Sequence, residues 1–176
     1  MTTQIVLSGV GGQGLISTGE IIGEAASIHE GIYATLTSSY GSETRGTFTK
    51  SDVIVSDEPI DYPNIDSPDV ILCLAQVAYD RYLPLLREDT LVFFDSETVV
   101  PSPEAPGCHN GFPFRRISIE LGNPAVANTI ALGLMVKMTR VLHEDSITLA
   151  IREYFSAKPK VIEINLKALE KGFSLV

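Results

Sequence analysis

The sequence predicts an α/β protein with a doubly wound, mainly parallel sheet, a Rossmann-like first βα unit and a helical C-terminal region. Three observations predict this fold class. An apolar run at residues 5–8 meets the glycine-rich motif GVGGQG at residues 9–14, and a helical pattern follows to about Glu30. Short runs of β-forming residues then alternate with helical segments, and the last third of the chain is helical in pattern. This alternation is typical of doubly wound sheets.

Each further element has its own signal in the sequence. Gly31 is a plausible stop for the first helix, and residues 32–37 are rich in β-formers. Apolar runs that indicate strands covered on both faces lie at 69–74 and 91–94. Further strands are expected at 47–55 and 114–119. Helices are expected from the end of the 69–74 strand to about Arg87 and at 124–142, 146–157 and 161–171, while the proline-rich stretch 101–113 is expected to be irregular.

Composition narrows the class of protein. A chain of 176 residues is expected to be a single domain, 1–176. Its net charge of −9 argues against nucleic acid or an anionic membrane surface as the main partner. Without a long apolar run or a leader pattern before the first strand, a cytoplasmic protein is expected.

The two cysteines, Cys73 and Cys108, are far apart and form no C-x-x-C motif. Two thiols cannot hold an iron–sulfur cluster, which normally needs four, and they do not suggest a disulfide framework. Reduced, mostly buried thiols are expected.

The glycine-rich motif is the first candidate site. In a strand–loop–helix unit the first glycine makes a tight turn, the second lets backbone approach a ligand, and the third allows close packing of helix on strand. The helix start then faces an anion or cofactor, and a glutamine amide stands at the helix entrance. The alternative is a tight turn without a ligand. The candidate contact residues are Gly9, Gly11, Gly12, Gln13 and Gly14.

Two features argue against NAD at this motif. Dinucleotide sites place an acidic residue after the second strand to bind the ribose hydroxyls, but residues 35–39 contain no Asp or Glu. No Lys or Arg precedes Arg45, so no cation stands ready for a 2′-phosphate. A free-standing NAD(P) dehydrogenase is therefore not expected.

The polar loop after the second expected strand is the second candidate site. Arg45 is the first cation of the chain, and the end of this strand should meet the same sheet edge as the glycine motif. The alternative is a solvated loop with a local Glu43–Arg45 pair of little energetic weight. The candidate residues are Tyr40, Gly41, Glu43, Arg45 and Gly46.

Other polar residues give weaker signals. His29 and His143 are expected near helix ends, where a partial positive charge is welcome, and His109 lies in the proline-rich stretch. Asn128 and Asn165, in apolar helices, need hydrogen-bond partners in the core or at an interface. Neither a catalytic nucleophile–base order nor a cluster of metal ligands is expected from these spacings.

The helix expected at 125–142 is apolar around most of its circumference. Such a helix needs cover on more than one side. It is either central to the domain or shared with another chain, which leaves a partner subunit or a homodimer of the isolated chain open.

The motifs together resemble the gamma subunit of the 2-oxoacid:ferredoxin (acceptor) oxidoreductases of the pyruvate, 2-oxoglutarate and ketoisovalerate types. The resemblance covers nearly the whole chain. One departure is Thr47, where the family commonly has another glycine. The segments that carry the resemblance are GVGGQG at 9–14, SYG at 39–41, Glu43, RG at 45–46, VIVS at 53–56, NTIALG at 128–133 and NLKALEKG at 165–172.

The resemblance implies a complex that oxidatively decarboxylates a 2-oxoacid, transfers the acyl group to coenzyme A and reduces ferredoxin. It implies alpha and beta subunits that hold thiamine diphosphate, with a delta subunit left open, and iron–sulfur clusters outside this chain. The expected substrate is 2-oxoglutarate or pyruvate, the former favoured by overall similarity. The isolated chain is expected to be inactive, with no catalytic residue or metal of its own, and both candidate loops are assigned to cofactor contact by analogy. The alternative is a stand-alone nucleotide- or coenzyme A-binding module.

Overall fold

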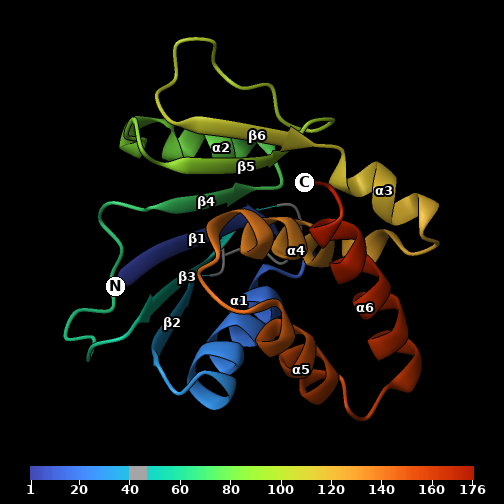
Figure 1. Cartoon of the computed structure of the whole chain (residues 1–176). Helices are drawn as coiled ribbons and strands as arrows, with labels where there is room; N and C mark the ends of the chain where they lie inside the picture. The colour runs from blue at the N-terminus through green and yellow to red at the C-terminus, as the bar shows by residue number, and fades with distance from the viewer. Residues whose placement is uncertain (40–46) are drawn as a thin grey trace.

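A computed structural model describes residues 1–39 and 47–176, which form a six-stranded sheet with helices on both faces (Figure 1). The strand order is β2-β3-β1-β4-β5-β6. Strands β1, β4, β5 and β6 run parallel, whereas β3 is antiparallel to both β1 and β2. The α/β, mostly parallel fold predicted from the sequence is thus confirmed. The strands are β1 (Thr2–Val10), β2 (Tyr33–Ser39), β3 (Phe48–Ser56), β4 (Val70–Cys73), β5 (Leu91–Asp95) and β6 (Cys108–Phe112).

The first βα unit forms where it was predicted, but the strand that pairs with β1 on one side is not the expected one. Strand β1 leads into helix α1 (Leu15–Glu24), which continues as a π-helical turn, η1 (Ala25–His29), before Gly31 adopts a φ of +66°. In a dinucleotide-binding fold β2 would pair with β1. Here β3 lies between them, so β1 and β2 are parallel without touching, and their carboxyl ends meet the same sheet edge as expected.

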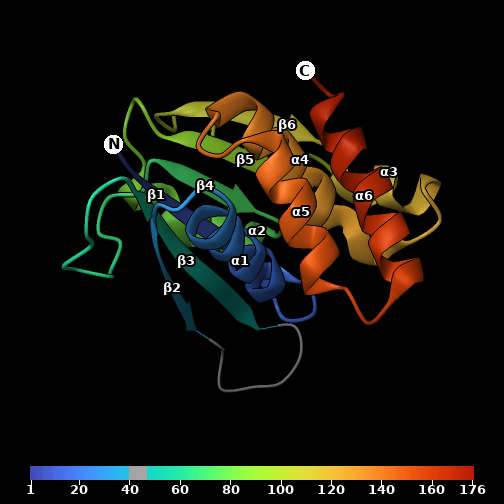
Figure 2. The same cartoon turned by 60° about the horizontal axis from the view of Figure 1, so that its bottom comes forward.

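Alternation along the strands divides the core between two faces. Ile5 and Leu7 of β1 pack into the larger core cluster, and Val6 packs into the smaller one on the opposite face. Figure 2 shows α1, α4, α5 and α6 on the larger cluster's face and α2 on the other. None of the helices in the described residues combines the length and apolar character of a membrane span. The remaining helices are α2 (Gln76–Tyr82), α3 (Phe114–Glu120), α4 (Ala127–Thr139), α5 (Glu144–Tyr154) and α6 (Pro159–Phe173), with 3₁₀ turns at Leu83–Leu85 and Pro124–Val126.

Helix α4 is the central helix of the larger layer. Its cover comes from this chain, because α1, α3, α5 and α6 all pack against it. Its apolar circumference is therefore not a reason to expect a partner subunit. The contact with α6 is close, since a Cβ atom built on Gly172 would overlap Ile130 O and lie 2.9 Å from Gly133 Cα.

One predicted strand is wrong. Residues 114–119 form helix α3, and the sixth strand, β6, lies inside the stretch expected to be irregular. Phe114 and Ile117, one helical turn apart, are both buried, while β6 is an edge strand and only partly covered. An edge strand does not need the continuous apolar run that marks a central one, so its sequence signal is weak.

Candidate functional site

The glycine-rich loop turns between β1 and α1 through two residues in left-handed conformations. Gly12 has a φ of +91° and Gly14 a φ of +72°, a region that side chains rarely adopt. A Cβ atom on Gly9 would overlap the Gln13 side chain, whereas one on Gly12 would meet no atom of the described residues within 4 Å. The loop is therefore tight on its protein side at Gly9 and open at Gly12.

The Gln13 amide holds this loop in place. Its Oε1 accepts from Val10 N at 2.8 Å, and its Nε2 donates to Leu74 O at 3.1 Å. The second bond ties the loop after β1 to the end of β4. The sequence suggested that this amide contacts a ligand, and the structure gives it these two bonds within the protein.

The loop lies at the topological switch point of the sheet. From β1 the chain passes through α1 on one face, and from β4 it passes through α2 on the other. The loops after these neighbouring parallel strands therefore diverge, which opens a crevice at their carboxyl ends. Crevices of this kind are the usual ligand sites of open α/β sheets.

A cavity of about 160 Å³ occupies this crevice. Its walls come from the glycine loop, from the ends of β4 and β5, and from α3 and the start of α4. The lining residues are Gly12, Gln13, Leu74, Asp95, Thr98, Arg115, Pro124, Ala125, Ala127 and Asn128.

Asn128 joins the cavity wall to the first helix. Its Nδ2 donates to Gly14 O at 3.1 Å and to Thr18 Oγ1 at 3.0 Å. Its Oδ1 is buried and has no hydrogen-bond partner in the described part of the chain. Since buried polar atoms are normally paired, this carbonyl oxygen is an unsatisfied acceptor beside the cavity.

Arg115 is the one cation among the described residues that line the cavity. Its backbone N–H donates to Asp95 Oδ2 at 2.8 Å, while Asp95 Oδ1 accepts from Glu97 N at 2.9 Å. Both oxygens of this buried carboxylate are thus held by backbone amides, one in the turn after β5 and one at the start of α3. The Arg115 guanidinium makes no hydrogen bond or ion pair within residues 1–39 and 47–176.

The start of α1 adds to this positive charge. The first N–H groups of a helix have no partner within the helix, and the helix dipole places partial positive charge there. Among the described residues, the site therefore combines helix amides, one unpaired guanidinium, one unpaired carbonyl oxygen and the Asp95 carboxylate, whose oxygens already accept from two backbone N–H groups. That set suits a small anionic group that also carries a hydrogen-bond donor.

The second candidate loop falls on residues that the structure does not describe. Tyr40, Gly41, Glu43, Arg45 and Gly46 all lie outside the described residues, so their assignment to cofactor contact stays a prediction. The next described residue is Thr47, whose backbone O accepts a hydrogen bond from Gly11 N at 3.0 Å. This bond ties the residue before β3 to the glycine loop.

The cysteines and histidines lie away from the cavity lining. Burial raises the pKa of Cys73 to about 12, and Cys108 is exposed, so only one of the two thiols is buried as predicted. Tyr79 OH and His109 Nε2 are 2.9 Å apart at the far face of the sheet. His143 precedes the N-terminus of α5, where positive charge is unfavourable, so the predicted dipole role is wrong for this residue.

Comparison with known proteins identifies the family of the chain. Its sequence matches the pyruvate ferredoxin/flavodoxin oxidoreductase family over residues 4–175. The chain belongs to this family. It is 40% identical to the 2-oxoglutarate synthase subunit KorC of Methanocaldococcus jannaschii, over 99% of this chain and 94% of that protein.

Solved structures agree with this assignment. The crystal structure of the gamma subunit of a keto/oxoacid ferredoxin oxidoreductase from Geobacter sulfurreducens has a TM-score of 0.87 and 36% identity, over 98% of this chain and 95% of that one. The chain is thus a gamma subunit of a 2-oxoacid:ferredoxin oxidoreductase. The fold of this chain also matches part of a longer chain, with a TM-score of 0.89 and 23% identity. The match covers 99% of this chain and 31% of the longer one. That chain is the 2-oxoglutarate:ferredoxin oxidoreductase of Magnetococcus marinus, whose structure contains 2-oxoglutarate, coenzyme A and succinyl-CoA.

Proposed function

We propose that this gamma subunit serves a 2-oxoglutarate:ferredoxin oxidoreductase and that its cavity at the glycine loop binds an anionic part of coenzyme A. The observation that carries the substrate proposal is the 40% identity, over nearly the full length of both chains, to a 2-oxoglutarate synthase subunit. Coenzyme A is present in the structure of a related 2-oxoglutarate enzyme. The chemistry of the cavity supports the second part.

The residues around the cavity fit such a group. Coenzyme A carries phosphate groups and amides, so it offers both negative charge and N–H donors. The α1 amides and the Arg115 guanidinium suit a phosphate, and Asn128 Oδ1, which is buried without a donor, suits an N–H group. Gly12 leaves open space on the approach to the helix start.

The size of the cavity limits how much of coenzyme A this chain holds. A site for a drug-sized molecule occupies roughly 300–1,000 Å³, and this cavity has about 160 Å³. The cavity therefore holds one portion of the molecule, and the remainder lies against other subunits or outside the cavity. Bound coenzyme A supplies the thiol that takes the acyl group, and this chain orients it without a catalytic residue of its own.

The other components of the reaction belong to partner subunits in this proposal. The two cysteines lie apart, one buried and one exposed, and cannot supply the four thiolates of an iron–sulfur cluster. Alpha and beta subunits hold thiamine diphosphate, clusters outside this chain pass electrons to ferredoxin, and the isolated gamma subunit is inactive. A purification of the native complex tests this arrangement, and a gamma subunit that purifies alone and binds NAD tightly would contradict it.

Adjacent arginines provide a matched test of the coenzyme A site. Arg115 lines the cavity, and its guanidinium has no partner among the described residues, while Arg116 forms exposed ion pairs with Glu97 and Glu120. A hydrogen bond to a charged group contributes about 1.5–3 kcal/mol, so Arg115→Ala is expected to raise the KM for coenzyme A roughly 10- to 150-fold in the assembled complex. Arg116→Ala should leave it unchanged.

Substrate choice is tested on the same complex. We expect kcat/KM for 2-oxoglutarate to exceed that for pyruvate and for branched-chain oxoacids. Equal or greater efficiency with pyruvate would overturn the substrate proposal and leave the coenzyme A proposal standing. Equal KM values for the two arginine variants would overturn the coenzyme A proposal and leave the substrate proposal standing.

A further inference from the structure

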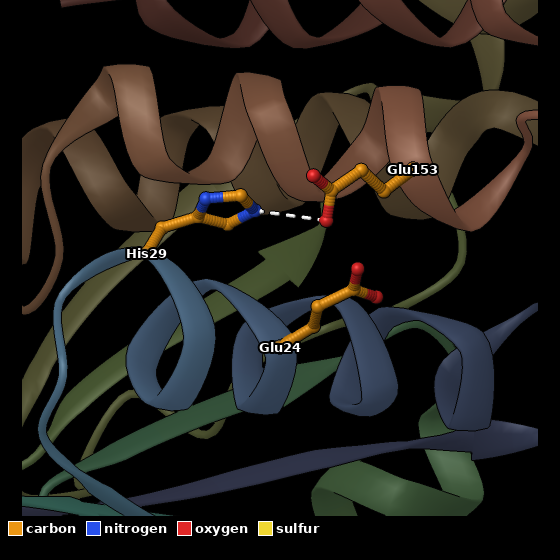
Figure 3. A group of neighbouring side chains, drawn as sticks. All are labelled: Glu24, His29 and Glu153. Atoms are coloured by element: carbon orange, nitrogen blue, oxygen red, sulfur yellow. Dashed lines mark ion pairs between the residues drawn. The ribbon is translucent and has the colours of Figure 1, made fainter.

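Three side chains with metal-ligand chemistry meet at the opposite end of α1 from the glycine loop. Glu24 ends α1, His29 ends the π-helical turn η1, and Glu153 lies in α5 (Figure 3). One ligand atom from each lies within 4.8 Å of the other two. The sequence predicted no such cluster, because the third member comes from a distant helix.

The π-helical turn is what brings Glu24 and His29 together. Residues five apart in an α-helix point about 140° away from each other. In η1 the backbone instead closes an i→i+5 hydrogen bond, from Glu30 N to Ala25 O at 3.1 Å. This wider turn carries His29 round to the side of Glu24, facing α5. Single π-turns of this kind are frequent at functional sites.

The imidazole has a buried nitrogen that makes no hydrogen bond to any described residue. Its Nε2 is inaccessible to solvent and lies 3.2 Å from Glu153 Oε2, an ion-pair distance that lacks the alignment of a hydrogen bond. The His29 side chain is 13% exposed and that of Glu153 is 53% exposed. The cluster is thus closed on the imidazole side and open to solvent on the Glu153 side.

The charge of the cluster is not balanced by a Lys or Arg. Neither Glu24 nor Glu153 pairs with either residue type within residues 1–39 and 47–176. Partial burial and the neighbouring Glu153 carboxylate raise the pKa of Glu24, against the opposing effect of His29. Two carboxylates held side by side in this way are stabilised by a cation between them.

We propose that Glu24, His29 and Glu153 form a Zn²⁺ site that links the end of α1 to α5. One imidazole nitrogen and two carboxylate oxygens, with water in a fourth position, make a set that zinc accepts at metal–ligand distances of about 2.0–2.2 Å. Tetrahedral ligands at such distances lie about 3.4 Å apart, close to the 3.2 Å between His29 and Glu153. The imidazole disfavours Mg²⁺ and Ca²⁺, which prefer oxygen ligands throughout.

The test is calorimetric titration of the purified full-length chain with ZnCl₂, in a Cys108→Ser background that removes the exposed thiol. We expect one Zn²⁺ per chain. Loss of an outer partner of a metal ligand typically costs 10- to 100-fold in affinity, so His29→Gln, Glu24→Gln and Glu153→Gln should each weaken binding by about 100-fold or more. His143→Gln and Glu163→Gln are the matched controls and should leave the affinity unchanged.

Thermal unfolding without metal checks that each variant is folded, and added ZnCl₂ should raise the Tm of the wild type but not that of His29→Gln. Co²⁺ as a substitute probe should give the visible absorption of a tetrahedral nitrogen and oxygen site in the wild type only. Absence of binding, or binding that survives the three cluster variants, would overturn the proposal. So would equal loss of affinity in the control variants.

Discussion

Asn128→Ala and Asn165→Ala form a pair of variants that tests how the cavity wall is built. The two asparagines are similarly buried, at 9% and 7% exposure, and each makes two hydrogen bonds. They differ in the carbonyl oxygen. Asn165 Oδ1 accepts from Thr129 Oγ1 at 2.7 Å, whereas Asn128 Oδ1 has no partner in the described residues.

This difference sets the expected free energies of unfolding. Two hydrogen bonds contribute about 1–3 kcal/mol, and one unsatisfied buried polar group costs about 1–3 kcal/mol. Asn128→Ala removes both bonds but also removes an unsatisfied oxygen, so its net effect should lie within about 2 kcal/mol of zero. Asn165→Ala removes both bonds and leaves the Thr129 hydroxyl unsatisfied, so it should destabilise by about 2–6 kcal/mol.

Urea unfolding followed by far-UV circular dichroism measures the difference, provided that both variants unfold in two states. Helix propensity and the lost side-chain volume are common to both substitutions and cancel in the comparison. Equal destabilisation of the two variants would mean that Asn128 Oδ1 is satisfied in solution, contrary to the structure.

Three further predictions follow from packing and burial. Gly172→Ala should destabilise by about 1–3 kcal/mol through overpacking, while Gly23→Ala, whose Cβ atom meets nothing within 4 Å, should stabilise by about 0.5–1 kcal/mol in urea unfolding. A thiol reagent at pH 8 should modify Cys108 in the native chain, and Cys73, whose pKa is raised to about 12, only after unfolding. The raised pKa of Glu24 favours the protonated side chain in the fold, so stability is lost as pH rises from the unfolded value of 4.5 through the folded one. The Tm of metal-free Glu24→Gln should therefore rise relative to the Tm of the metal-free wild type as the pH rises through that interval. A Tm difference that stays the same at every pH would contradict this.

Local patterns in the sequence were sufficient to predict the elements whose conformation is set by residues close together in the chain. The apolar runs of β4 and β5 are covered on both faces, and Gly12 and Gly14 adopt the positive φ values that a tight turn requires. The edge strand β6 was missed because half of its surface needs no apolar residue. The antiparallel insertion of β3 was also missed, since strand order depends on contacts between distant segments.

The candidate site was predicted only in part for the same reason. The glycine loop is contiguous in the chain and visible as a motif. Arg115 was assigned to a strand, and it reaches the cavity because helix α3 starts against Asp95. Asn128 was correctly expected to need a partner, but its partners, Gly14 O and Thr18 Oγ1, belong to the first helix. Such pairings follow from tertiary structure and leave no signal at fixed spacing in a single sequence.

Hydrogen–deuterium exchange of the assembled complex, with and without coenzyme A, reports on the proposed coenzyme A site. If an anionic part of coenzyme A binds at the start of α1, peptides that cover residues 8–17 should exchange more slowly when it is present. Peptides from α5, none of whose residues lines the cavity, should not change. Unchanged exchange at residues 8–17 under saturating coenzyme A would contradict the account.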